Sequence, residues 1–299
     1  MPSTFCAAVD QYHREGFLLR PGFFAREVAL LKNLIDSERK RLQSLEDLTI
    51  DSAGREASCL GYLGHGDDVV TSFATTERLV NLVKALLGDD VYLLKGKLNV
   101  KWGAAAPERR GGWDPHQDRA AWAREGLPGK DTVSVAIAID RSDTENGTIQ
   151  VLPGSHAAGL VEHTRIDRGY GIPSQIYGQL RDRHGRMPVI MDAGDVLLFS
   201  GDVVHLSEPN LDDRRRAVLF LTFNALNNSP AEGVGPSRYY CTEALQPRDD
   251  EILFGLVQQF EKGQYKPEFD WDTIRREREN DIAEGIDSGW TGLTPTLVS

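Results

Sequence analysis

The chain has 299 residues, of which 40% are hydrophobic and 26% are charged, as in an ordinary globular protein with a sizeable core. Its 34 basic and 45 acidic residues give a formal net charge of −11, which argues against a nucleic-acid or anionic-membrane binder, because such proteins need cations to neutralise phosphates. Three scattered cysteines, an N-terminus without an apolar leader and the lack of any run of about 20 apolar residues predict a reduced, cytosolic chain without membrane spans.

The first elements in chain order are two amphipathic helices. Residues 24–45 repeat apolar side chains at helical spacing, and the outer face of this segment is charged. Residues 75–90 repeat the pattern, with Thr75 or Thr76 as the N-cap and Gly88 as the stop. We therefore expect the first third of the chain to be mainly helical.

The hydrophobic period shortens in the middle of the chain. Short runs rich in valine, isoleucine, leucine and phenylalanine follow one another, and several alternate in polarity. These runs are residues 91–102, 131–140, 147–155, 194–205 and 215–225. Turn signals such as Pro153-Gly154 separate them. The pattern predicts a β-sandwich or barrel such as a jelly roll.

Residues 157–188 interrupt this series without a clear period. The stretch is rich in basic side chains, namely His163, Arg165, Arg168, Arg181, Arg183, His184 and Arg186. An irregular segment of that length inside a compact domain is typical of a lid or a binding loop. We expect it to select the substrate.

The C-terminal part returns to helical spacing, over residues 249–263 and 271–280. No internal repeat, low-complexity tract or linker divides the chain. We expect one domain over residues 1–299, with a helical N-terminal part over about 1–90, a β-core over about 91–226 and a helical extension over about 227–299.

Two histidines and one aspartate form a candidate metal site. His116 and Asp118 are two residues apart after a predicted strand, and His205 follows another predicted strand. Two imidazoles and one carboxylate can occupy one face of a first-row metal and leave open positions, which is the facial triad of non-haem Fe(II) oxygenases. A closed structural zinc site would need a fourth protein ligand, and the cysteines offer none at a recognisable spacing.

A carboxylate-binding arginine is expected near this site. Arg216 comes eleven residues after His205, with Ser207 between them. If the chain turns after Ser207 and returns as the neighbouring antiparallel strand, Arg216 can bind a carboxylate through two parallel hydrogen bonds, and the serine hydroxyl can add a third. Strand alternation sends Arg215 to the opposite face, so we expect it and Arg214 to face solvent.

Four segments together resemble the phytanoyl-CoA dioxygenase family. They are "HQD" at 116–118, "ENGTIQVLPGSH" at 145–156, "GDVLLFSGDVVHLSEPN" at 194–210 and Arg216. As an ordered set, spaced in this way, the motifs are specific, and the resemblance covers roughly residues 10 to 225. It implies a mainly β protein with flanking helices, built on a cupin-like double-stranded β-helix, that uses Fe(II), 2-oxoglutarate and O2.

The resemblance also implies roles for individual residues. His116, Asp118 and His205 would bind iron, while Arg216 and Ser207 would bind the distal carboxylate of 2-oxoglutarate. Further positions that match the family pattern are Lys95, Asn99 and Ser134 for the co-substrate, and Gln117 and Trp122 for the substrate. The residues after Asp118 depart from the pattern of ectoine hydroxylases, so we do not expect ectoine as the substrate.

The resulting hypothesis is an oxygenase that hydroxylates an unactivated C–H bond of a small metabolite or biosynthetic intermediate and releases succinate and CO2. A halogenase is disfavoured because Asp118 supplies the carboxylate that halogenases lack, and the net charge disfavours a nucleic-acid demethylase. Two alternatives stay open at this point. One is a non-catalytic jelly roll that binds a metal or small ligand, and the other is a metal-dependent hydrolase or isomerase, which would not need Arg216.

Overall fold

The fold is known from a computed structural model. It describes residues 3–61, 63–64, 66–124, 126–166, 169–230, 243–266, 269 and 271–284. Of the residues that the sequence analysis singles out, Arg168 lies outside this described part, as does one of the three cysteines, Cys241. Within the described part, no helix is both long enough and apolar enough to cross a membrane.

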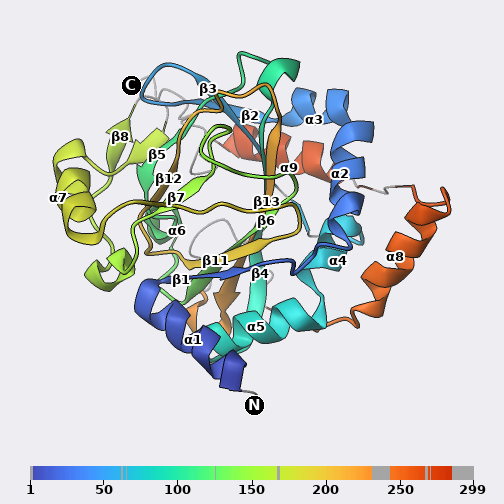
Figure 1. The fold of residues 1–299 in the computed structure, drawn as a ribbon, viewed down its shortest axis with the longest axis horizontal. Coiled ribbons are helices and arrows are strands. Elements are labelled where there is room, and N and C mark those ends of the chain that lie inside the picture. Colours follow the sequence, from blue (N-terminus) through green and yellow to red (C-terminus); the bar gives the residue numbers. More distant parts are fainter. Residues whose placement is uncertain are drawn as a thin grey trace.

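Two antiparallel sheets form the centre of the molecule (Figure 1). The larger sheet has the strand order β1 (Phe17–Arg20), β11 (Val196–Ser200), β6 (Thr132–Ala138), β13 (Arg216–Ala225), β4 (Val91–Lys101), β3 (Glu56–Leu60) and β2 (Asp47–Ile50). The smaller sheet has the order β10 (Met187–Pro188), β7 (Ile149–Val151), β12 (His205–Ser207) and β5 (Trp113–His116). A separate hairpin joins β8 (Thr164–Ile166) to β9 (Gly169–Gly171).

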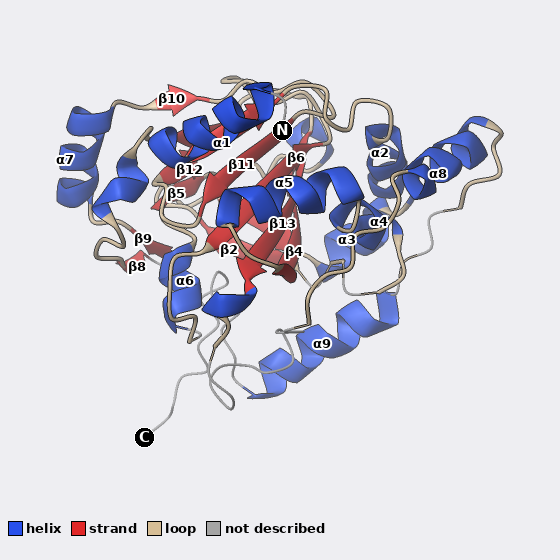
Figure 2. Ribbon diagram, turned by 90° about the horizontal axis from the view of Figure 1, so that it is seen from below, coloured by secondary structure: helices blue, strands red, loops and turns tan. Residues whose placement is uncertain are grey.

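Helices flank these sheets, and α1 and α5 lie across the larger one (Figure 2). The helices are α1 (Ser3–Glu15), α2 (Val28–Ser37), α3 (Arg39–Leu45), α4 (Val69–Ala74), α5 (Glu77–Leu87), α6 (Arg119–Arg124), α7 (Ser174–His184), α8 (Glu251–Glu261) and α9 (Trp271–Glu284). Gly88 ends α5 with a φ of 70°, as its sequence predicts. The helix expected over 24–45 divides at Glu38 into α2 and α3.

Alternation along β13 separates the helix layer from the interior between the sheets. Leu219, Leu221 and Phe223 join the hydrophobic core that the helices share with the larger sheet. Phe220 and Thr222 point the other way and line a pocket between the two sheets. This follows from the two-residue period of a strand, which places successive side chains on opposite faces.

A β-bulge in β4 decides which of its side chains reach that pocket. The pairing of β13 with β4 shifts register at Leu94, because Thr222 faces Lys95 and the next residue, Phe223, faces Leu93. After the bulge, alternate residues from Lys95 to Lys101 share the inner face. A bulge re-aims the side chains that follow it, and here it directs several polar ones inwards.

Three features differ from the sequence-based expectation. The N-terminal part expected to be helical also contains β1, β2 and β3, all of which belong to the larger sheet. The segment 157–188, expected to be irregular, contains α7 and the β8–β9 hairpin. Its helix has no buried residue, and only Ile176, Tyr177 and Leu180 pack, partly buried, against an apolar cluster, so the apolar period in its sequence is weak. Division into a single domain stays a prediction.

Candidate metal centre

Two histidines that are far apart in the sequence face each other across neighbouring strands. His116 ends β5 and His205 begins β12, and the two residues are direct partners in the antiparallel register. Their ring centroids are 4.1 Å apart, with the ring planes inclined by 55°. The smaller sheet therefore brings two imidazoles to one point, as the sequence predicts.

Asp118 completes the cluster from the turn between β5 and α6. Its Oδ1 lies 3.8 Å from Nε2 of His116 and 3.9 Å from Nε2 of His205. Its other oxygen, Oδ2, accepts a hydrogen bond of 2.6 Å from the Ser134 hydroxyl on β6. Ser134 thus fixes the carboxylate with one oxygen turned towards the histidines.

Backbone carbonyls fix the tautomer of both imidazoles. Nδ1 of His116 donates to the carbonyl of Asp114 at 2.6 Å, and Nδ1 of His205 donates to the carbonyl of Val203 at 3.0 Å. A carbonyl can only accept, so in the neutral form of each ring Nδ1 carries the proton and Nε2 has the lone pair. Burial, and next the neighbouring His205, lower the pKa of His116 well below its usual value, so this imidazole is neutral near pH 7.

This donor set fits a divalent metal ion. Within the described part of the chain, these three residues form a group whose ligand atoms all lie within 4.8 Å of one another. The separations of 3.8 and 3.9 Å from Asp118 Oδ1 can be spanned by one ion with bonds of about 2.1 Å. Neutral imidazoles with an oriented second nitrogen are also what metal ligation requires.

The three residues line one wall of a pocket between the two sheets. Its empty volume is about 590 Å³, open solvent included. The pocket is lined by Cys59, Lys97, Asn99, Trp113, His116, Asp118, Ser134, Ile149, His205, Leu206, Ser207, Arg216, Phe220 and Thr222. Seven of the residues expected from sequence are therefore brought together here, namely His116, Asp118, His205, Arg216, Ser207, Asn99 and Ser134.

Arg216 reaches the pocket from the opposite sheet. It begins β13, as expected, but the prediction that β13 would be the neighbouring strand of β12 is wrong. The strand β12 pairs with β5 and β7 in the smaller sheet, whereas β13 pairs with β4 and β6 in the larger one. The eight residues between them are enough to cross from one sheet to the other, so Arg216 faces the smaller sheet across the pocket.

Carbonyl and amide oxygens hold the buried Arg216 side chain, which is only 1% exposed. Its Nε and Nη2 donate to the carbonyl of Gly147 at 3.2 and 2.8 Å, and Nη1 donates to Oδ1 of Asn99 at 2.7 Å. The Asn99 amide nitrogen donates in turn to the carbonyl of Ser58. Burial lowers the pKa of Arg216 to about 10, so it stays a cation at neutral pH.

A second buried cation beside Arg216 was missed by the sequence analysis. Lys101 is the register partner of Arg216 and is also 1% exposed, and it lies behind the pocket lining rather than in it, in contact with Ser207, which does line the pocket. Its Nζ donates to Ser207 Oγ at 3.0 Å, to the carbonyl of Gly147 at 3.2 Å and to the carbonyl of Glu208. Lys101 shares the strand face of Asn99, so period-two alternation from Asn99 was the signal that could have found it.

Three further residues expected at the site do not line the pocket. Trp122 is buried in a separate apolar cluster with Tyr92 and Leu127. The side chain of Lys95 lies on the inner face of β4 but outside the pocket lining. Gln117 is fully buried, and its amide is bonded to backbone groups of Gly159, Val161 and Asp202. Their roles in binding stay predictions that these positions do not support.

Gln117 instead connects the metal motif to the loop that follows residue 157. Its own backbone N–H donates to Nε2 of His163 at 2.9 Å, while Nδ1 of His163 donates to the carbonyl of Val161. Burial is the largest cause that lowers the pKa of His163. Neutral His163 is needed here, because Nε2 must accept the Gln117 proton.

An ion pair links the two segments that carry the metal ligands. Arg119, directly after Asp118, donates two hydrogen bonds to Asp202 at 2.5 and 3.0 Å. Asp202 is almost fully buried and lies three residues before His205. A bidentate ion pair of this kind fixes the separation of the two segments. Nothing in the sequence distinguishes Arg119 and Asp202 from ordinary surface charges.

The arginines before Arg216 do not both face solvent. Arg214 is exposed, as expected. Arg215 lies on the opposite face from Arg216, but its side chain is only 15% exposed and binds Asp140 and Asp36. The prediction that Arg215 faces solvent is therefore wrong, because helix α2 covers this end of the sheet and supplies Asp36.

Several other residues of the pocket lining were not anticipated. Lys97 could have been found from Asn99 by alternation, as Lys101 could. Trp113 precedes the histidine on β5, and Phe220 lies on the inner face of β13. Cys59 could not have been found, because its strand, β3, was not predicted; it reaches the pocket as the register partner of Asn99.

Comparisons with known proteins agree with this geometry. The family model described as phytanoyl-CoA dioxygenase (PhyH) matches residues 12–218. The L-proline trans-4-hydroxylase of Streptomyces griseoviridis is 30% identical over 246 residues, which cover 76% of this chain and 88% of the relative. The ectoine dioxygenase of Halomonas elongata is 27% identical over 247 residues, which cover 78% of this chain and 73% of the relative.

A solved structure supports the fold. EctD from S. alaskensis, crystallised with 2-oxoglutarate and 5-hydroxyectoine, superposes with a TM-score of 0.67 at 23% identity. The match covers 81% of this chain and 86% of that one. The expected jelly roll with flanking helices is thereby confirmed.

Proposed function

The chain belongs to the phytanoyl-CoA dioxygenase family, and from this premise we propose that it hydroxylates a small metabolite that carries an anionic group. It is a non-haem Fe(II)- and 2-oxoglutarate-dependent dioxygenase, as the relatives and the triad of His116, Asp118 and His205 together indicate. The observation that carries this conclusion is the pairing of His116 with His205 across two strands, with Asp118 Oδ1 within 3.9 Å of both.

The metal and the distal carboxylate of the co-substrate would occupy opposite ends of the pocket. His116, Asp118 and His205 would hold Fe(II) through two nitrogens and one oxygen. The carboxylate clamp, which we define as Lys101, Ser207 and Arg216, would hold the distal carboxylate of 2-oxoglutarate. Two buried cations with a hydroxyl bonded to one of them suit a carboxylate, because hydrogen bonds to charged groups are stronger than those between neutral groups.

When bound, Fe(II) and 2-oxoglutarate supply the oxygen-activating chemistry, in which the co-substrate loses CO2 and becomes succinate. The residues of the chain orient the metal ligands and the co-substrate. Ser134 keeps Asp118 Oδ1 turned towards the histidines, and the carbonyls of Asp114 and Val203 hold both rings with Nε2 facing the metal site. Arg216 and Lys101 fix the far end of the co-substrate, so its keto acid end is presented to the metal ligands.

The proposed substrate class comes from the remaining pocket wall. Lys97 is a cation that lines the pocket among Trp113, Ile149 and Phe220, so an apolar skeleton with one acidic group would suit this wall. One relative is named for L-proline, which is an amino acid with one carboxylate. We propose a cyclic or branched amino acid, or a similar small carboxylic acid, that places its carboxylate towards Lys97.

The test is a substrate screen with Fe(II), 2-oxoglutarate and O2, read by succinate formation and by product mass. The panel would include L-proline, ectoine and other small carboxylic acids, each beside its amide or ester. We expect turnover of an acid, with product heavier by one oxygen atom, and little turnover of its neutral derivative. Succinate formation that no member of the panel stimulates would contradict the proposed substrate class.

Two matched lysine variants sharpen the test. Lys97→Met should raise KM for the substrate while leaving KM for 2-oxoglutarate unchanged. Lys95→Met is the control, because Lys95 shares the inner face of β4 but does not line the pocket. Equal effects of the two variants would contradict a specific role for Lys97. The cytosol remains the proposed location of the reaction.

A further inference from the structure

The carbonyl of Gly147 is a shared acceptor for both cations of the carboxylate clamp. It accepts hydrogen bonds from Nε and Nη2 of Arg216 and from Nζ of Lys101. Neither cation has a carboxylate within ion-pair distance among the described residues. This one oxygen therefore helps to set the direction of both cations, together with Asn99 for Arg216 and with Ser207 and Glu208 for Lys101.

Gly147 itself has little room to move. Its φ is 75°, and a Cβ at this position would collide with the carbonyl of Glu208 and lie 2.8 Å from Lys101 Nζ. Only glycine adopts such a backbone readily at this close an approach. The residue cannot orient its own carbonyl through a side chain, so its neighbours must do so.

The turn around Gly147 is held from both sides. Asn146 accepts from the backbone N–H of Asp143 at 2.8 Å and donates to the carbonyl of Arg141 at 2.8 Å. On the other side, the N–H of Thr148 donates to the carbonyl of Asp143 at 2.9 Å. The carboxylate of Asp143 also accepts from the backbone N–H groups of Glu145 and Asn146. Asp143 is therefore the centre of the turn.

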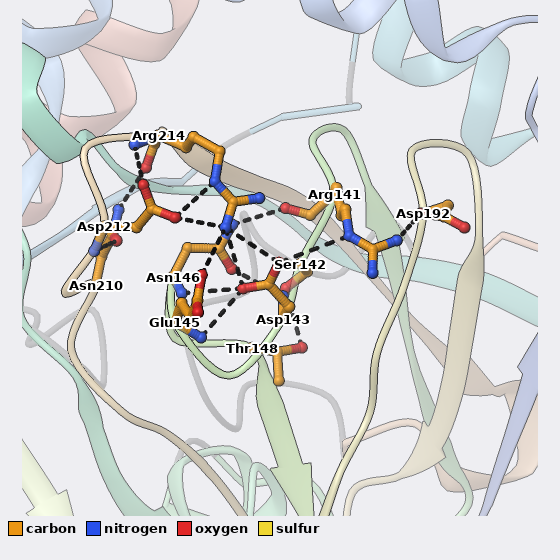
Figure 3. Close-up of polar contacts among 10 residues, drawn as sticks. All are labelled: Arg141, Ser142, Asp143, Glu145, Asn146, Thr148, Asp192, Asn210, Asp212 and Arg214. Atoms are coloured by element: carbon orange, nitrogen blue, oxygen red, sulfur yellow. Dashed lines mark hydrogen bonds and ion pairs between the residues drawn. The ribbon is translucent and has the colours of Figure 1, made fainter.

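An outer ion-pair cluster ties this turn to the loop before β13. We define the cluster as Asp143, Glu145, Asp212 and Arg214, and Figure 3 shows the guanidinium of Arg214 among the three carboxylates. Nη2 of Arg214 lies 3.2 Å from Asp143 Oδ2 and 3.4 Å from Glu145 Oε2, and Nε donates to Asp212 at 2.6 Å. Arg214 is two residues before Arg216. The cluster therefore joins the turn that contains the Gly147 carbonyl to the segment that carries Arg216, which donates to that carbonyl.

We propose that Asp143 and Arg214 are positioning residues for 2-oxoglutarate: they hold the 141–148 turn against the loop before β13 and so place the Gly147 carbonyl that aims Arg216 and Lys101 at the distal carboxylate. This inference rests on the proposed function of the carboxylate clamp. None of the four cluster residues lines the pocket, so we expect the cluster to act through the Gly147 turn and the loop that leads to Arg216.

The test measures binding rather than turnover. Anaerobic calorimetric titration of the Fe(II)-loaded protein would compare 2-oxoglutarate with 2-oxobutanoate, which keeps the keto acid end but lacks the distal carboxylate. Asp143→Ala should weaken 2-oxoglutarate about tenfold, a size typical of coupling within one hydrogen-bond network, and leave 2-oxobutanoate within about twofold. Arg214→Gln should weaken the binding of 2-oxoglutarate by about threefold, a smaller effect because the turn contacts of Asp143 stay in place.

Arg215→Gln is the matched control. It removes a guanidinium with two ion pairs one residue from Arg216, but on the opposite face, and its partners Asp36 and Asp140 lie outside the 141–148 turn. We expect it to leave the affinity ratio of the two ligands unchanged. A ratio that stays at the wild-type value in both Asp143→Ala and Arg214→Gln would overturn the proposal, because a purely structural defect weakens both ligands alike. Wild-type protein that binds 2-oxobutanoate no less tightly than 2-oxoglutarate would instead overturn the proposed clamp itself.

Discussion

The two ends of the pocket hold their polar side chains in different ways. At the metal end, each ligand is fixed through the atom that does not face the site: Nδ1 of His116 and His205, and Oδ2 of Asp118. At the clamp end, Arg216 and Lys101 are fixed through the donors themselves, on carbonyl and amide oxygens and a hydroxyl.

This difference shows that one pocket is prepared for two opposite charges. The metal end offers lone pairs and a carboxylate oxygen, which suit a cation. The clamp end offers two desolvated cations whose partners are neutral, and within the described residues neither has an acidic partner at ion-pair distance. A buried charge without a counter-charge is costly, so an anionic ligand would relieve the clamp end.

The largest expected effect comes from removing the charge at the metal end. Asp118→Ala should lower Fe(II) affinity and activity more than about 100-fold, since even outer partners of metal ligands account for about 10–100-fold. Asp114→Ala is the control, because it deletes a nearby carboxylate bonded to Ser52 but keeps the carbonyl that orients His116. Equal Fe(II) affinities of the two variants, measured by anaerobic titration, would show that Asp118 is not a ligand.

At the clamp end, Arg216→Gln should raise KM for 2-oxoglutarate about 10- to 150-fold. This range corresponds to the loss of one charged hydrogen bond, which contributes about 1.5–3 kcal/mol. Fe(II) affinity should stay near the wild-type value, because the guanidinium contacts none of the three ligands. Steady-state kinetics with varied 2-oxoglutarate, beside a metal titration, check both statements. A drop in Fe(II) affinity without a change in this KM would reverse the assignment of the two ends.

A smaller effect is expected from the hydroxyl that orients Asp118. Ser134→Ala should weaken Fe(II) about tenfold, at the low end for a partner of a metal ligand, because Oδ2 loses its donor. Thr132→Val is a matched control on the same strand, since its buried hydroxyl has no hydrogen-bond partner among the described residues. If both variants bind Fe(II) equally well, Ser134 does not act through Asp118.

The sequence predicted the metal end of the pocket more completely than the clamp end, and the reason is physical. His205 ends the hydrophobic run 194–205, which is easily recognised, whereas His116 ends β5, a strand that was not predicted. Two histidines with a carboxylate are nevertheless a donor set typical of a metal site. Arg216 was recognised too, but its place in the opposite sheet was not, because the pairing of strands depends on contacts distant in the sequence. A local sequence pattern does not determine which strands pair with one another.

The residues that sequence reasoning missed or misplaced have different origins. Lys101 and Lys97 could have been found by alternation from Asn99, whereas the bulge at Leu94, which brings this face of β4 to the inside, has no clear sequence signal. Arg119 and Asp202 look like ordinary surface charges until the fold buries them together. Gln117 was placed at the substrate from its position in the motif, whereas the fold engages its amide with the backbone.

The last prediction concerns the proton on Lys101. Burial, and next the Arg216 guanidinium, lower the pKa of Lys101 well below its usual value of about 10.4. A bound carboxylate favours the ammonium and raises this pKa again, so 2-oxoglutarate should bind with uptake of a proton at pH values between the two. In that window affinity should fall as pH rises, by up to about tenfold per unit.

Calorimetry in buffers of different ionisation enthalpy measures this uptake, and Lys101→Met should abolish it while keeping the length of the side chain. In the protein without ligand, the same lowered pKa means that the folded state binds fewer protons than the unfolded one. Its stability should therefore rise with pH across the range from the lowered pKa to about 10.4, and Lys101→Met should flatten that rise. Proton uptake that persists in Lys101→Met would assign the titration to another group, and the clamp end would then hold a permanently charged lysine.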